Sequence, residues 1–227
     1  MSSQTVTFSG DLDWIPDFNV DQYLNLPDDS PEDSRIRKYD VFLSFRGEDT
    51  RKSFTSHLFA SLQNAGIIVF KDDHSLVRGD DISKSLLQAI QESRISVIVF
   101  SKNYADSRWC LQELMKIMEC NRTTGQMLLP VFYDVHPSEV RHQTGEFGKV
   151  FRNLSKRILK GDELMVPKWR NTLEEEESMV LEDGYKDIVL KWKDALHEAA
   201  GLAGFLVLNS RLPTSSLHFN NFLLLCF

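Results

Sequence analysis

Four short apolar runs, separated by segments of helical length, constrain the fold of this chain more than any other feature. They cover residues 39–45, 67–70, 95–100 and 127–133. Runs of this length fit strands that are buried on both faces of a sheet, and the segments between them repeat apolar residues at helical spacing. Strands that alternate with helices predict an α/β domain with a parallel sheet and helices on both faces.

The connecting segments predict where the helices begin and end. Asp49 or Thr50 is expected to cap a first helix that ends at Gly66. After the fourth apolar run, Pro137 is typical of the start of a short helical turn, and a longer amphipathic helix follows. Trp192 marks the inward face of a last helix that is expected to cover the sheet.

Changes of composition indicate three parts of the chain. Residues 1–37 are rich in Asp, Ser and Pro and have no sustained period, which predicts a disordered acidic leader. The ordered domain is expected over residues 38–204. The remainder, 205–227, is an atypical tail whose apolar end is far too short to span a bilayer.

The charge and the cysteines exclude several classes of function. A net charge of −7 over 227 residues argues against nucleic-acid binding that is driven by general electrostatics. No secretory signal or membrane span is visible, so a cytoplasmic or nucleocytoplasmic location is expected. Cys110, Cys120 and Cys226 form no CxxC pair, which suits a reducing compartment and predicts neither a disulfide framework nor a metal site.

A carboxylate interrupts the helical pattern that follows the third apolar run. Glu113 lies four residues after Trp109 and three after Cys110, so the three side chains share one stripe of the predicted helix. Two interpretations are open: a candidate active-site arrangement, or a solvated glutamate on an amphipathic helix. Cys110 lies beside the core face of this helix and is interpreted as a packing residue.

The loops after the strands favour the first interpretation. Ligands of open α/β sheets bind at the carboxyl ends of the strands, where the strand order reverses. Segments 45–50, 72–80 and 101–109 leave such ends, and they converge on one cleft if the first strand is central. The sequence contains no GxGxxG, Walker, HExxH or Gly-x-Ser-x-Gly motif.

Four motifs in order closely resemble the TIR (Toll/interleukin receptor-like) domain of plant intracellular immune receptors. They are YDVFLSFRGEDTR at 39–51, RGD at 78–80, YADSRWCLQEL at 104–114 and PVFYDVHPSEVR at 130–141. The resemblance covers about residues 39–204. It implies a flavodoxin-like fold with strand order 2-1-3-4-5, self-association through TIR domains, and cleavage of NAD+ at the nicotinamide–ribose bond.

The resemblance also assigns roles to individual residues. The family's catalytic glutamate falls on Glu113, Trp109 resembles a pocket wall, and Ser56 and His57 match a pair that the family uses for self-association. The implied nucleotide-contacting residues are Phe45, Arg46, Gly47, Glu48, Asp49, Thr50 and Gly79. NAD+ is thus expected as a substrate, with no tightly bound cofactor and no metal.

A single carboxylate suits this chemistry. Nicotinamide leaves NAD+ as a neutral amine, so its departure needs no general acid, whereas most glycoside hydrolases need two carboxyl groups. A placed carboxylate stabilises the oxocarbenium character that develops on the ribose. The product is linear ADP-ribose or a cyclic form, and the sequence does not choose between them.

Two departures from the family leave an alternative open. His136 stands where the family has an aspartate that would cap a helix. The nucleotide-switch module and leucine-rich repeats of full-length receptors are not part of this sequence, so a TIR-only or truncated member is expected. The alternative function is that of a non-catalytic adaptor or decoy that binds the TIR domains of full-length receptors.

Overall fold

The parallel sheet predicted from the apolar runs is present and has five strands. The computed structural model describes residues 37–71, 84–160 and 175–208. The strands are β1 (Tyr39–Phe45), β2 (Val69–Lys71), β3 (Ser93–Phe100), β4 (Met127–Tyr133) and β5 (Phe205–Val207). They pair in parallel in the order β2-β1-β3-β4-β5, so the flavodoxin-like order 2-1-3-4-5 is confirmed.

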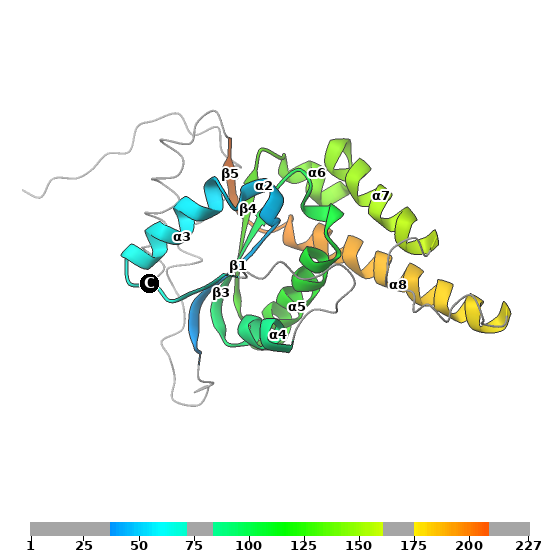
Figure 1. Ribbon diagram of the computed structural model, residues 1–227, viewed down its shortest axis with the longest axis horizontal. Helices are drawn as coiled ribbons and strands as arrows, with labels where there is room; N and C mark the ends of the chain where they lie inside the picture. The colour runs from blue at the N-terminus through cyan, green and yellow to red at the C-terminus, as the bar shows by residue number, and fades with distance from the viewer. Residues whose placement is uncertain (1–36, 72–83, 161–174, 209–227) are drawn as a thin grey trace, which may run out of the picture.

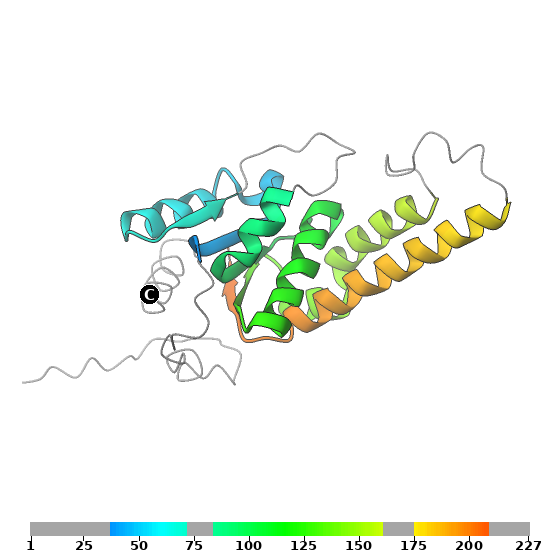
Figure 2. The same cartoon turned by 90° about the horizontal axis from the view of Figure 1, so that it is seen from below.

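Helices cover both faces of this sheet, as the sequence predicts. They are α2 (Gly47–Thr50), α3 (Phe54–Asn64), α4 (Lys84–Gln91), α5 (Arg108–Thr124), α6 (Pro137–His142), α7 (Gly145–Lys160) and α8 (Glu175–Ala199), with a 3₁₀ turn η1 at Tyr104–Asp106. Helix α3 lies on one side of the sheet, and α4, α5 and α8 lie on the other (Figures 1 and 2).

The alternation of side chains along the strands explains the two layers. Val41 and Leu43 of β1 point to the face that packs against α3. Phe42, between them, points to the opposite face, where Leu111 of α5 and Trp192 of α8 belong to the same core. Buried strands with apolar residues on both faces are characteristic of parallel sheets, which accounts for the unbroken apolar runs in the sequence.

The first helix expected from the sequence is two helices in the structure, which corrects that prediction. Asp49 and Thr50 lie inside the short α2 instead of capping a long helix, and Ser53 precedes α3. The hydroxyl of Thr55 donates to that of Thr50 over 2.8 Å, and both side chains are buried. This side-chain contact lies across the break between the two helices.

The second and fifth strands also differ from the sequence-based boundaries. The backbone N–H of Ile67 donates to the carbonyl oxygen of Leu62 in the last turn of α3. The N–H of Ile68 donates to the Asp40 carboxylate, and β2 begins one residue later, at Val69. The fifth strand lies at 205–207, beyond the expected domain boundary at 204. The domain boundary is therefore corrected to include β5.

Local features stabilise the end of α5 and the start of α6. Gly125 ends α5 with a φ of 66°, in the left-handed region that glycine enters without steric cost. His136 caps α6, because its Nδ1 accepts the N–H of Ser138 over 3.2 Å. An imidazole nitrogen thus makes the cap that the family's aspartate would make.

Several predictions concern residues outside the described ranges. They are the leader over 1–37 apart from Arg37, the loop at 72–80 with Gly79, and the tail beyond Leu208.

Candidate active site

The ends of two neighbouring strands position the candidate site. β1 ends at Phe45 and leads into α2, while β3 ends at Phe100 and leads through η1 into α5. The two strands pair along their length, with Phe45 opposite Val99. The structure therefore brings segments 45–50 and 101–109 together at one edge of the sheet, as the sequence predicts.

Glu113 lies in the second turn of α5 and is buried. The helix begins at Arg108, and its N-cap Ser107 accepts the N–H of Cys110 over 3.3 Å. The Glu113 side chain faces the sheet, where the hydroxyl of Ser44 on β1 donates to its Oε2 over 2.7 Å. With 6% of its surface exposed, Glu113 is not a solvated residue on the outer face of the helix.

Two further ionisable side chains lie against this carboxylate. The hydroxyl of Tyr104 contacts that of Ser44 at 2.9 Å and donates to the carbonyl oxygen of Cys110 over 3.0 Å. Burial raises the pKa of Tyr104 well above its usual value, and the neighbouring Cys110 and Glu113 raise it further. Tyr104 is thus held in its neutral form next to Glu113.

Cys110 packs into the core, which fits its interpretation as a packing residue. Its thiol is buried and contacts the carbonyl oxygen of Phe45 at 3.6 Å. Burial, followed by the charge of Glu113, raises the pKa of the Cys110 thiol far above that of an ordinary cysteine. A neutral buried thiol is a poor nucleophile, which favours the packing role of Cys110.

A network of charged side chains joins the loops around the site. The Arg46 guanidinium donates to Glu48 over 2.7 Å and to Asp106 of η1 over 3.5 Å. Arg157 of α7 donates to the other oxygen of Asp106 over 2.5 Å. Arg46 therefore lies at the sheet edge among carboxylates that fix its direction.

Asp49 connects the loop after β1 to the loop after β3. Its carboxylate accepts hydrogen bonds from the Ser101 hydroxyl (2.6 Å), the Asn103 N–H (3.0 Å) and the Asn103 amide (3.2 Å). These bonds fix the two segments that border Glu113. Thr50, by contrast, is buried with Thr55 in the α2–α3 turn.

Trp109 lies in the first turn of α5, and Gly47 begins α2. The Arg108 guanidinium lies 4.4 Å from the centroid of the half-buried Trp109 ring. The indole Nε1 is buried and has no hydrogen-bond partner among the described residues. A Cβ at Gly47 would lie 2.9 Å from the Arg51 guanidinium.

Ser56 and His57 lie apart from this site, on the exposed side of α3. The Ser56 hydroxyl donates to the carbonyl oxygen of Arg51.

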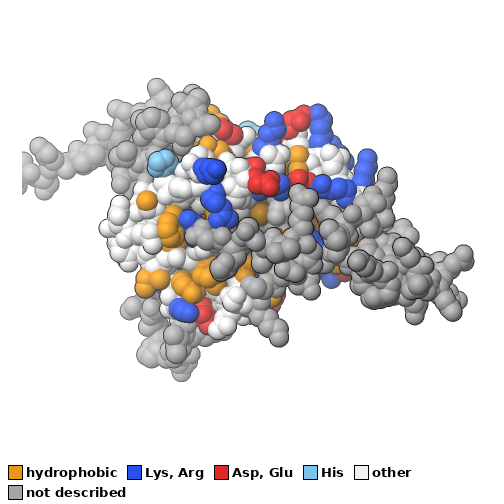
Figure 3. Space-filling model, in the orientation of Figure 1, with side chains coloured by type: hydrophobic (Ala, Val, Ile, Leu, Met, Phe, Trp, Pro, Cys, Tyr) orange, Lys and Arg blue, Asp and Glu red, His pale blue; other side chains and the backbone are white. Residues whose placement is uncertain are grey.

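On the face shown in Figure 3, basic and acidic side chains are interspersed and apolar side chains lie between them.

Sequence reasoning missed four residues of this arrangement: Ser44, Tyr104, Asp106 and Arg157. Ser44 carried a detectable signal, because it is a hydroxyl inside an apolar run and a buried hydroxyl needs a partner. The partnerships of Asp106 and Arg157 depend on packing between η1 and α7 and have no local signal.

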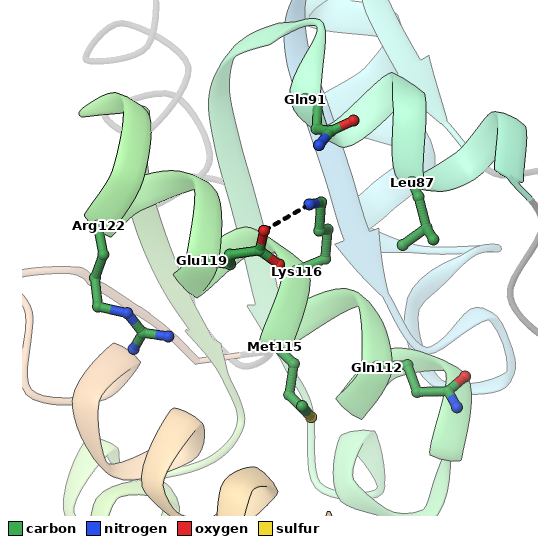
Figure 4. Close-up of a pocket in the computed structure, with 7 residues that line it drawn as sticks. All are labelled: Leu87, Gln91, Gln112, Met115, Lys116, Glu119 and Arg122. Atoms are coloured by element: carbon green, nitrogen blue, oxygen red, sulfur yellow. Dashed lines mark hydrogen bonds and ion pairs between the residues drawn. The ribbon is translucent and has the colours of Figure 1, made fainter.

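A surface groove between α4 and α5 is separate from Glu113. It has a volume of about 510 Å³ and is bordered by Leu87, Gln91, Gln112, Met115, Lys116, Glu119 and Arg122 (Figure 4). Lys116 pairs with Glu119 across 2.9 Å at its edge. None of the predicted site residues borders this groove, so its size does not make it the candidate site.

The described ranges contain no group of three His, Cys, Asp or Glu side chains that could hold a metal ion. Within the same ranges, every helix is too short or too polar to cross a membrane.

The fold and the motifs around Glu113 define a TIR domain. The family model for the TIR domain matches residues 38–186, and the chain belongs to this family. It is 45% identical over 188 residues to the disease resistance protein RPV1 of Vitis rotundifolia, covering 83% of this chain and 11% of the relative. It is 50% identical over 166 residues to the TMV resistance protein N of Nicotiana glutinosa, covering 73% of this chain and 12% of the relative.

A solved structure shows the same fold. The TIR domains of the activated Roq1 resistosome, which directly recognises the pathogen effector XopQ, match with a TM-score of 0.61 and 41% identity. The match covers 82% of this chain and 97% of that chain. The chain thus corresponds to the TIR domain of plant disease resistance proteins, and it spans about a tenth of the length of the curated relatives it matches.

Proposed function

We propose that this TIR domain hydrolyses NAD+ at the bond between nicotinamide and ribose, with Glu113 as the catalytic residue. The buried carboxylate of Glu113, held by Ser44 where β1 and β3 end, is the observation that supports this function. A carboxylate in a site with little water interacts more strongly with a developing positive charge than one in bulk solvent.

The reaction needs only groups that this site offers. The N-glycosidic bond breaks as its electron pair moves to the nicotinamide nitrogen, which becomes neutral. Water then adds to the ribose carbon and releases one proton, giving ADP-ribose and nicotinamide. When the adenine end of the same molecule acts as the acceptor instead of water, a cyclic product forms. Glu113 stabilises the cationic ribose and accepts a hydrogen bond from a ribose hydroxyl or from the attacking water.

Other residues around Glu113 are proposed to hold the substrate. The Trp109 ring offers a flat surface, and its buried Nε1 offers a donor that has no partner among the described residues. Arg46, which follows β1, is proposed to attract the pyrophosphate of NAD+, with Gly47 allowing close approach of the backbone. Gly79 is proposed to contact the substrate from the loop that follows β2.

Self-association is proposed to accompany this activity. The exposed pair Ser56 and His57 on α3 forms the contact surface between copies. The similar TIR domains of Roq1 are part of an assembled resistosome, which supports this proposal. The intracellular location expected from the sequence agrees with such a role in plant immune signalling and remains a proposal.

Nicotinamide release by the purified chain tests the proposed hydrolysis. Protein concentrated enough to assemble is incubated with NAD+, and the wild type is compared with Glu113→Ala. Because the proposed carboxylate is lost, release is expected to fall by a factor of about 10² to 10³. Glu119→Ala is the matched control, since Glu119 is an exposed glutamate on the same helix and should leave the rate unchanged.

The same assay separates the enzyme from the second candidate, a non-catalytic adaptor. The exposed α3 surface favours an adaptor as much as it favours an assembling enzyme. An adaptor would assemble normally and release nicotinamide at equal background rates with and without Glu113. That result would refute the proposed hydrolase.

A further inference from the structure

Three buried oxygen atoms of Glu113, Ser44 and Tyr104 form a chain that ends on the carbonyl of Cys110. The successive distances are 2.7 Å from Ser44 to Glu113, 2.9 Å from Ser44 to Tyr104, and 3.0 Å from Tyr104 to the Cys110 oxygen. All three lie in the range of O–H···O hydrogen bonds. Ser44 and Tyr104 are both fully buried, so water does not compete for these contacts.

The number of hydrogens depends on the protonation of Glu113. Each hydroxyl of this chain carries one hydrogen, and a carbonyl or an ionised carboxylate carries none. With Glu113 ionised, two hydrogens serve three contacts, so one contact has no hydrogen whichever way the hydroxyls turn. A proton on Glu113 supplies the third hydrogen. The Ser44–Glu113 bond, in which Ser44 donates to the ionised carboxylate, is then reversed and runs from Glu113 to Ser44. The other two bonds run from Ser44 to Tyr104 and from Tyr104 to Cys110.

We propose that Ser44 and Tyr104 are positioning residues that hold Glu113 through this chain and favour its proton-bearing form in the resting site. This inference rests on the proposed hydrolase function, in which the ionised form of Glu113 acts on the substrate. Substrate that brings a cationic pyridinium to the site favours the ionised form, so binding and loss of the proton are coupled.

The charged and titratable groups around Glu113 come from each neighbouring element. Tyr104 belongs to η1 and Cys110 to α5, and both are held neutral by burial. From the end of β1 and from α2, Arg46 and Asp49 act electrostatically on Cys110 in opposite directions. Neither supplies a hydrogen to the three contacts that join these oxygen atoms.

Removing the Tyr104 hydroxyl should shift the titration of Glu113 to lower pH. In Tyr104→Phe the protonated form loses two hydrogen bonds of the chain, while the ionised form loses one. The expected shift is about one pH unit. The ring itself remains packed at 5.0 Å from the centroid of Phe100, so the change is confined to the hydroxyl.

The titration is measured by carbon-13 NMR of the full chain labelled at glutamate carboxyl groups, without NAD+. Glu113→Gln identifies the resonance. Tyr133→Phe is the matched control, because Tyr133 is also buried but lies in the core on the other face of the sheet. A shift in Tyr104→Phe with none in Tyr133→Phe supports the chain. An unmoved or raised titration in Tyr104→Phe overturns it.

Repeating Tyr104→Phe in a protein that already carries Ser44→Ala tests whether Tyr104 acts through Ser44 or through a general effect on folding. Ser44→Ala breaks the chain in the middle, so adding Tyr104→Phe to it should leave the Glu113 titration unchanged. An equal shift in both backgrounds would show that Tyr104 acts by another route and would refute the chain.

The pH dependence of the rate gives the kinetic counterpart. The acid limb of kcat/KM for nicotinamide release, which reports the free protein, should move to lower pH in Tyr104→Phe by the same amount. The NMR titration needs no turnover, so failure of the proposed hydrolysis and failure of the chain remain separate results. If the Glu113 titration moves in a protein that releases no nicotinamide, the hydrogen-bonded chain is supported and the proposed hydrolase function is refuted.

Discussion

At the scale of single residues, burial decides the protonation of the groups next to Glu113. Cys110 and Tyr104 have raised pKa values for the same reason: their charged forms would lose solvation inside the core. Cys110 is a neutral packing group in the fold, as its place beside the core face of the helix predicts. Glu113 is the ionisable side chain to which the proposed function assigns a chemical role.

The raised pKa of Cys110 predicts a loss of stability at alkaline pH. A thiol whose folded pKa lies above the ordinary 9.0 contributes fully to stability below that value. As the pH rises above it, the unfolded thiol ionises and the folded one does not, so unfolding is favoured. The free energy of unfolding should fall by up to about 1.4 kcal/mol per pH unit on this account.

Urea denaturation of the wild type and Cys110→Ala measures this effect. Between pH 9 and pH 10, below the ordinary tyrosine value of 10.0, the wild type should lose stability more steeply than the variant. Parallel stability curves for the two proteins would contradict the assignment.

At the scale of elements, charged side chains join segments that the sheet alone leaves independent. Asp106 on η1 contacts Arg46 after β1 and Arg157 on α7. The Arg46 and Asp106 side chains are 16% and 31% exposed, so their pair is less screened than pairs on the open surface. The network of Arg46, Asp106 and Arg157 holds the border of the candidate site from two sides.

Asp106→Ala should therefore destabilise the fold more than loss of an exposed ion pair. We expect a loss of about 1–2 kcal/mol, because two guanidinium groups lose their common partner. The control is Glu198→Ala, which removes the exposed pair between α8 and Arg122 of α5 and should cost less than about 1 kcal/mol. Thermal and urea unfolding compare the two variants, and equal losses would show that the network adds no stability.

The elements differ in how well sequence predicts them. β1, β3 and β4 are long buried strands, so their apolar runs are clear. β5 has only three residues, and its partner β4 is more than 70 positions earlier, so no local pattern indicates it. A contact between two buried threonines lies across the break between α2 and α3, and helical spacing does not encode it.

At the scale of the whole molecule, the topology places the candidate site. The central position of β1 brings the loops after β1 and β3 together, which allowed the sequence to predict that these two loops meet. The contacts of Ser44 with Tyr104 and with Glu113 were not predicted, because they join residues 60 and 69 positions apart. Their geometry exists only after the sheet and α5 have packed.

Assembly is the property of the whole molecule that the α3 surface is proposed to control. Ser56→Ala combined with His57→Ala should lower the mean molar mass in light scattering at high protein concentration. Both side chains are exposed, so the free energy of unfolding should change by less than about 0.5 kcal/mol. An unchanged molar mass would place the contact between copies elsewhere.

The most direct test of the account is the charge of Glu113. Glu113→Gln keeps the size of the side chain and an oxygen that can accept the Ser44 hydroxyl, and it removes only the negative charge. The account predicts that nicotinamide release from NAD+ by assembled protein falls about 10²-fold or more in Glu113→Gln, with unchanged assembly. Release at the wild-type rate would contradict it.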